Sequence, residues 1–91
     1  MEAMQTTAKE MGLSEELARE LTYHTAAGAA ALARHSEDDI ATLRKNVTSP
    51  GGTTEQAIVQ FESGDLRGLV ATALNAARTR SVELAEETDN T

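Results

Sequence analysis

The sequence predicts an all-α fold of about five helices that assembles as an intertwined homodimeric helical bundle. Apolar residues recur every three or four positions through the longer segments, which is the spacing of an amphipathic helix. No segment alternates apolar and polar residues over four or more positions, so we expect no β-strand. Apolar residues make up 40% of the 91 residues and aromatic residues only 2%, with much of the apolar share being Ala. Such small side chains favour thin, closely packed helices over a thick globular core.

The first predicted helix runs from Glu2 to Met11, and Gly12 is suited to end it in a left-handed conformation. Leu13 supplies the apolar residue that often follows such a glycine. Ser14 then has the features of an N-cap for a second helix, which continues to about Arg34.

A third helix is predicted to begin after Ser36 and to end by about Asn46. Ser36 is the expected N-cap, and Asp39, three residues later, closes a capping box with it. The acidic run 37–39 suits the positive end of a helix dipole. We therefore interpret these carboxylates as helix-terminal charges rather than as a cation site.

The fourth predicted helix runs from Thr54 to about Glu62. Thr53 is its expected N-cap, and Gln56, three residues later, is the expected capping-box partner. The positions on this helix that we expect to be buried are Ala57, Ile58 and Phe61.

The fifth predicted helix is the longest and is capped by Asp65, after Gly64 has ended the fourth. Its apolar stripe keeps a three- or four-residue spacing over about five turns and consists of Leu66, Leu69, Val70, Ala73, Leu74, Ala77, Ser81 and Leu84. We interpret this stripe as both core and partner surface. Residues 86–91 are polar and lack the periodicity, so we expect a frayed tail there and a folded domain over residues 1–85.

A net charge of −7 argues against nucleic acid and anionic membranes as partners, because both require basic patches. The chain has no Cys, which excludes disulfides and thiol chemistry. Its apolar runs are shorter than the roughly 18 residues of a membrane span and no signal peptide is visible, so we expect a cytoplasmic location. No acidic motif frames His24 and His35 as metal ligands, and we assign no metal.

The segment Val47–Thr54 contains the only Pro in the chain and two of its six Gly. The run Ser49-Pro50-Gly51-Gly52 predicts a turn, because Pro lacks an N–H and glycines allow φ > 0. A turn that leads directly into a helix N-terminus presents N–H groups and a partial positive charge, which suit a carboxylate or a phosphate. The same residues also suit an ordinary connection between two helices, and turn signals alone leave both interpretations open.

This segment resembles the signature of pyrroline-5-carboxylate reductases. The pattern Val-x-Ser-Pro-Gly-Gly-x-Thr at residues 47–54 is the specific part of the resemblance, and Ala-Ile at 57–58 and Phe-Glu at 61–62 extend it. The run Arg-x-Arg-x-x-Glu-Leu at residues 78–84 is also similar to that family. The order of helices and glycines matches the C-terminal, helical dimerisation domain of these enzymes over nearly the whole chain.

The resemblance implies that the segment forms half of a substrate site. The family reduces the C=N bond of 1-pyrroline-5-carboxylate to L-proline, the last step of proline biosynthesis, with NADPH or NADH. The implied substrate-binding residues are Ser49, Gly51, Gly52, Thr53 and Thr54. The Ser49 region and the backbone N–H groups of residues 52–54 hold the carboxylate in this scheme. The Thr54 hydroxyl then bonds to the ring nitrogen and is the implied catalytic contact.

The resemblance also implies where the cofactor is bound. The family's N-terminal Rossmann domain binds NADP(H) or NAD(H), and it has no counterpart in this sequence, nor does the first half of the first dimerisation helix. Because the cofactor supplies the hydride, we expect no cofactor in this chain and no reductase activity from it alone.

We expect the chain to form a homodimer, and an assembly of dimers is left open. Residues 26–31 are all Ala or Gly and form a nearly smooth helical face, and the fifth helix carries its long apolar stripe. One small chain cannot cover both surfaces, whereas a twofold partner covers them with its own copies. The alternative function is a stand-alone helical homodimer whose turn binds an anion and has no catalytic role.

Overall fold

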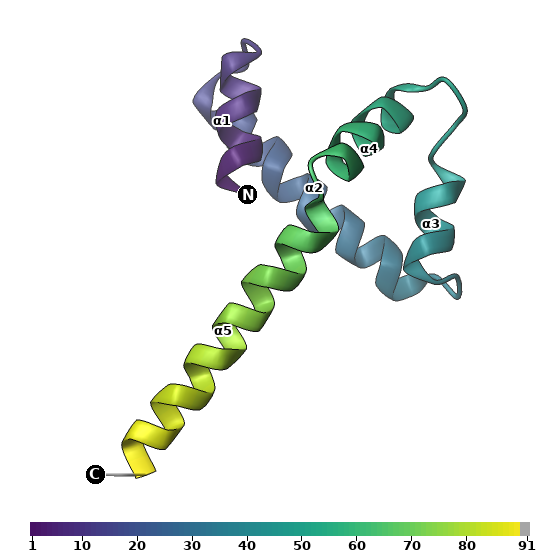
Figure 1. Cartoon of the computed structure of the whole chain (residues 1–91). Coiled ribbons are helices and arrows are strands. Elements are labelled where there is room, and N and C mark those ends of the chain that lie inside the picture. The colour runs from purple at the N-terminus through teal and green to yellow at the C-terminus, as the bar shows by residue number, and fades with distance from the viewer. Residues whose placement is uncertain (90–91) are drawn as a thin grey trace. The chain divides into compact units, whose positions relative to one another are not determined.

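A computed structural model of the chain describes residues 1–89, and these residues are all-α, as the sequence predicts. Five helices and no strand lie within them (Figure 1): α1 (Glu2–Glu10), α2 (Glu15–His35), α3 (Ile40–Asn46), α4 (Thr53–Ser63) and α5 (Leu66–Asp89). The chain divides into two compact units, Met1–Asn46 with α1 to α3 and Val47–Thr91 with α4 and α5.

The connection between α1 and α2 is a tight reversal made by Gly12, as predicted. Gly12 has a φ of +107°, and its N–H donates to the Lys9 carbonyl oxygen at 2.9 Å. The Leu13 N–H donates to the Ala8 carbonyl oxygen at 3.2 Å, which completes the pair of bonds of a Schellman motif. The reversal allows α1 to lie beside the first part of α2 (Figure 1).

The first half of α2 carries the only buried side chains among residues 1–89, and they are small. The side-chain oxygen of Ser14 accepts the Leu17 N–H at 3.2 Å, which confirms Ser14 as the N-cap. Ala18 is completely buried, and Thr22 is 4% exposed. The Thr22 hydroxyl donates to the Ala18 carbonyl oxygen at 2.8 Å, so its burial leaves no hydroxyl unsatisfied.

The N-cap of α3 is Asp39, and the prediction that Ser36 caps this helix is wrong. The Asp39 carboxylate accepts the Thr42 N–H at 2.8 Å, and the Asp39 carbonyl oxygen accepts the Leu43 N–H at 3.0 Å. Ser36 ends α2 and accepts the Asp38 N–H at 3.1 Å in a local turn instead. The backbone N–H of Thr42, and after it the Thr42 hydroxyl, lower the pKa of the Asp39 carboxyl, because both bonds favour its charged form.

The junction between α4 and α5 depends on Asp65, which caps α5 as predicted. Asp65 has a φ of +56°, a left-handed conformation that Asp tolerates better than most residues. Its N–H donates to the Glu62 carbonyl oxygen at 3.1 Å, and its carboxylate accepts the Gly68 N–H at 3.2 Å. A Cβ on Gly68 would collide with this carboxylate, so a side chain at that position would shift the Asp65 carboxylate from where it lies.

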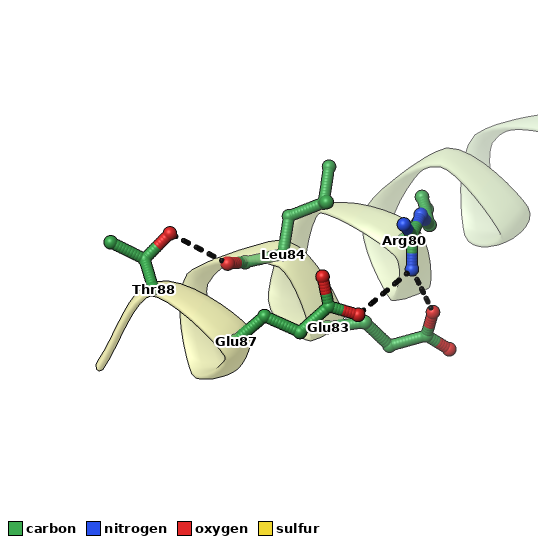
Figure 2. Close-up of polar contacts among 5 residues, drawn as sticks. All are labelled: Arg80, Glu83, Leu84, Glu87 and Thr88. Carbon is green, nitrogen blue, oxygen red and sulfur yellow. Dashed lines mark hydrogen bonds and ion pairs between the residues drawn. The ribbon is translucent and has the colours of Figure 1, made fainter. Parts of the chain in front are cut away.

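The last helix, α5, continues through Asp89, and the prediction of a frayed tail from residue 86 is wrong for 86–89. The Arg80 guanidinium lies between two carboxylates of the following turns (Figure 2). Its Nη1 is 3.0 Å from Glu83 Oε2 and 3.5 Å from Glu87 Oε1. An ion pair at the i,i+3 spacing of Arg80 and Glu83 adds roughly 0.2–0.5 kcal/mol to an exposed helix.

A hydroxyl bond also holds the end of α5. Thr88 Oγ1 donates to the Leu84 carbonyl oxygen at 3.0 Å (Figure 2). The polar residues of this segment therefore support the helix through local bonds that do not require apolar periodicity. The predicted fraying of residues 90–91 lies outside the described residues.

Most large apolar side chains of the single chain are exposed. Leu69 and Leu74 on α5 are 65% and 66% exposed. Ala57 and Phe61 on α4 are also exposed, contrary to prediction, and Ile58 is half-buried. The reason is that α4 lies against the beginning of α5 only, while the rest of α5 extends away from it (Figure 1). The apolar faces that the sequence predicts on α4 and α5 are present, but these two helices cover little of them within their own unit.

Candidate functional site

The Ser49-Pro50-Gly51-Gly52 run forms the predicted turn. The Gly52 N–H donates to the Ser49 carbonyl oxygen at 2.9 Å, which closes a four-residue β-turn. Pro50 occupies the second position, and Gly51 has a φ of +73° at the third, which is the pattern of a type II turn. A Cβ on Gly52 would lie 3.1 Å from the Ser49 carbonyl oxygen, so a side chain at residue 52 would press on the turn.

Helix α4 begins directly after this turn, one residue earlier than predicted. Gly52 is the N-cap, with φ −84° and ψ 175°, and Thr53 is the first helical residue. The predicted capping box of Thr53 and Gln56 is therefore wrong: the Gln56 N–H donates to the Gly52 carbonyl oxygen at 3.4 Å. A glycine at the N-cap has no side chain that could accept the N–H groups of the first helical turn.

Glu55, which the sequence did not identify as part of the site, instead bonds to an N–H that precedes the helix. Glu55 Oε1 accepts the Gly51 N–H at 3.2 Å, and the side chain is half-buried. Glu at the third position of a helix commonly reaches back to an N–H before the helix. This position relative to Gly52 was the signal that would have identified Glu55.

The N–H groups that we expected to bind a carboxylate differ in whether they already have an acceptor within the segment. The N–H groups of Gly51 and Gly52 are bonded within the segment, to Glu55 and to Ser49 respectively. The N–H groups of Thr53 and Thr54 are in the first turn of α4, where helix geometry provides no intrahelical acceptor. Ser49 is exposed and Thr54 is half-buried. The structure thus brings the Ser49 turn directly before the Thr53 and Thr54 amides, an arrangement that can bind a small anion at a helix N-terminus.

The described residues do not form a nucleotide-binding loop of the Rossmann type. That loop requires a strand before the glycines and a helix after them, whereas residues 1–89 contain helices only. The same residues contain no group of three or more His, Asp or Glu side chains that could hold a metal ion. No helix within them is long and apolar enough to cross a membrane.

Comparison with known proteins places residues 1–84 in one family model, described as pyrroline-5-carboxylate reductase dimerisation. The chain is 52% identical over 87 residues to the pyrroline-5-carboxylate reductase of Pseudomonas aeruginosa, covering 96% of this chain and 32% of that protein. The chain therefore spans about a third of the length of such relatives.

Two solved structures share the fold. The pyrroline-5-carboxylate reductase of Coxiella burnetii superimposes with a TM-score of 0.86 at 52% identity, over 91% of this chain and 31% of that one. The pyrroline carboxylate reductase of Plasmodium falciparum, solved with NADP bound, has a TM-score of 0.81 at 29% identity. The match to it covers 84% of this chain and 30% of that one.

Proposed function

The chain belongs to the pyrroline-5-carboxylate reductase dimerisation family, and we propose that it is the dimerisation and substrate-binding part of such a reductase. The whole enzyme reduces 1-pyrroline-5-carboxylate to L-proline in the cytoplasm, as the last step of proline biosynthesis. The observation that carries this proposal is the family match over residues 1–84, which includes the Val47–Thr54 turn at the start of α4.

The substrate carboxylate binds at the beginning of α4 in this proposal. The Thr53 and Thr54 amides and the Ser49 hydroxyl are hydrogen-bond donors located on either side of a Gly52 N-cap. A carboxylate there also gains from the positive end of the helix dipole. The Thr54 hydroxyl bonds to the ring nitrogen and so contacts the reacting C=N group.

The nicotinamide cofactor binds to a part of the enzyme outside these residues, because residues 1–89 do not provide the strand–loop–helix that its phosphates require. The role of this chain is to position the substrate rather than to supply the hydride. We therefore predict that the purified 91-residue chain does not reduce 1-pyrroline-5-carboxylate with NADPH or NADH. Measurable turnover by the chain alone would contradict the proposal that the cofactor binds outside these residues.

The chain acts as a homodimer in this proposal. Single chains leave Phe61, Leu69 and Leu74 more than half exposed. Contiguous apolar surface larger than a few hundred Å² is rare on monomers and marks an interaction site. A twofold partner covers such faces with identical copies of them. Sedimentation of the purified chain measures both the dimer and any assembly of dimers.

A chimera tests the catalytic part of the proposal. Residues 1–84 replace the corresponding part of the Coxiella burnetii reductase, with which the chain shares 52% identity. We expect NAD(P)H-dependent reduction of 1-pyrroline-5-carboxylate. We also expect Thr54→Ala to lower kcat/KM by about 10- to 1,000-fold, the scale of one lost transition-state hydrogen bond. Ser49→Ala should raise KM mainly, because the carboxylate binds similarly in the ground and transition states.

A matched control variant and two contradicting results complete the chimera experiment. Extending it through Thr88 allows Thr88→Ala, which removes a hydroxyl from the last turn of α5 and should leave the kinetics unchanged. Unchanged kinetics in Thr54→Ala would remove Thr54 from the site. A chimera that is folded and dimeric but inactive would favour a stand-alone helical dimer over a reductase.

A further inference from the structure

Glu55 places a negative charge on the turn that is proposed to bind a carboxylate. Its Oε1 accepts the Gly51 N–H at 3.2 Å, and its own backbone is in the first turn of α4 beside Thr54. The Glu55 carboxylate is thus bonded at the positive end of α4, which is also where an anionic ligand would bind.

Two anions at one helix N-terminus repel each other. The Glu55 carboxylate and a ligand bound to the Thr53 and Thr54 amides belong to the first turn of the same helix, whose pitch of about 5.4 Å sets the scale of their separation. Two unit charges about 5 Å apart in water weaken an equilibrium constant about fourfold, and more where water is partly excluded. Because Glu55 is half-buried, its repulsion of a bound carboxylate should exceed this value for water.

We propose that Glu55 is an internal anion of the turn, which occupies the Gly51 amide in the free chain and lowers the affinity of the site for small carboxylates. This inference rests on the proposed function, because it takes the turn before α4 as the carboxylate site. Glu55 is a positioning and affinity-determining residue in this scheme. It contacts the turn and does not react.

A Glu55→Gln substitution separates charge from geometry. The Gln side-chain carbonyl can accept the Gly51 N–H as the Glu55 carboxylate does, but it carries no charge. If Glu55 only held the turn in shape, Glu55→Gln would behave like the parent chain. If its charge opposes a ligand carboxylate, Glu55→Gln binds that ligand more tightly.

The experiment uses the whole 91-residue chain labelled with ¹⁵N, and it follows the Gly51, Thr53 and Thr54 amides by NMR during titration with L-proline. We expect Glu55→Gln to bind L-proline at least about fourfold more tightly than the parent chain, as the repulsion estimate requires. L-Prolinamide, which keeps the ring ammonium but has no carboxylate, should not bind more tightly to Glu55→Gln than to the parent chain. Glu16→Gln is the matched control, because Glu16 is also a first-turn acid of a helix and the change in net charge is identical.

The outcomes distinguish this inference from the proposed function. Equal affinity of the parent and Glu55→Gln chains for L-proline would overturn the role of Glu55 while leaving the carboxylate site in place. Weaker binding by Glu55→Gln would also overturn it, because Glu55 would then assist the ligand. Absence of L-proline binding in both chains would contradict the proposed site itself, and the inference with it.

Discussion

Gly28 provides a direct test of the proposed dimer, because the single chain does not need a glycine there. A Cβ placed on Gly28 meets no atom within 4 Å outside the backbone of its own helix. Leu and Ala are both better helix formers than Gly, Ala by about 0.8–1 kcal/mol. In an isolated chain, Gly28→Leu should therefore leave α2 intact and even stabilise it.

The proposed dimer predicts the opposite for Gly28→Leu, since a close crossing of helices at the Ala/Gly face leaves no room for a large side chain. Overpacking costs about 1–3 kcal/mol at one position. Twofold symmetry introduces the substitution twice in each interface, so the cost is about 2–6 kcal/mol per dimer. This corresponds to a rise in the dimer dissociation constant of roughly 30-fold to 2 × 10⁴-fold. Gly28→Ala adds a single methyl group and should have a smaller effect.

Sedimentation equilibrium of the parent chain, Gly28→Ala and Gly28→Leu measures these dissociation constants. Circular dichroism on the same samples shows whether the helices are retained. An unchanged dissociation constant with a higher thermal midpoint in Gly28→Leu would remove Gly28 from the interface. A folded parent monomer of 9.7 kDa at micromolar concentration would refute the dimer altogether.

Three further predictions concern stability. The thermal midpoint of the chain should rise with protein concentration, because association stabilises the folded state, and melts over a hundredfold concentration range would show this. Asp65→Ala should cost about 0.5–2 kcal/mol in urea unfolding, and Asp65→Asn much less, because Asn also caps helices and tolerates φ of +56°. The Asp39 carboxyl has a lowered pKa, so its contribution is complete above its ordinary value of 3.8 and is lost as the pH falls through the lower folded value. Acid titration of helicity should be shallower in Asp39→Asn than in the parent chain.

Helix positions and the Gly12 reversal could be predicted because they depend on neighbouring residues alone. Gly12 and Leu13 offer one plausible helix end, and the observed bonds to Lys9 and Ala8 agree with it. The caps of α3 and α4 were predicted incorrectly because two candidates compete within four residues. At α3 the Asp39 carboxylate is nearer to the first free amides than Ser36, and it bonds to Thr42.

The sequence predicted the turn of the candidate site, but it did not predict that the Glu55 carboxylate bonds to this turn. Ser49, Pro50 and Gly51 define a type II turn through local conformational preferences, and the structure has this turn. The contact of Glu55 with the Gly51 amide depends on where α4 begins. Since the sequence placed that beginning one residue late, Gln56 rather than Glu55 received the capping role.

The exposed faces show what an apolar pattern can and cannot specify. Periodicity identifies which face of a helix is apolar and becomes buried, but it does not identify the chain that covers this face. Phe61, on the helix that begins at the candidate site, is 57% exposed in the single chain. If a second copy covers Phe61, the contact that forms the dimer also restrains the helix whose first amides bind the carboxylate. Dimerisation and substrate binding would then use opposite ends of α4, so a loss of association should weaken the site without any change in the turn residues.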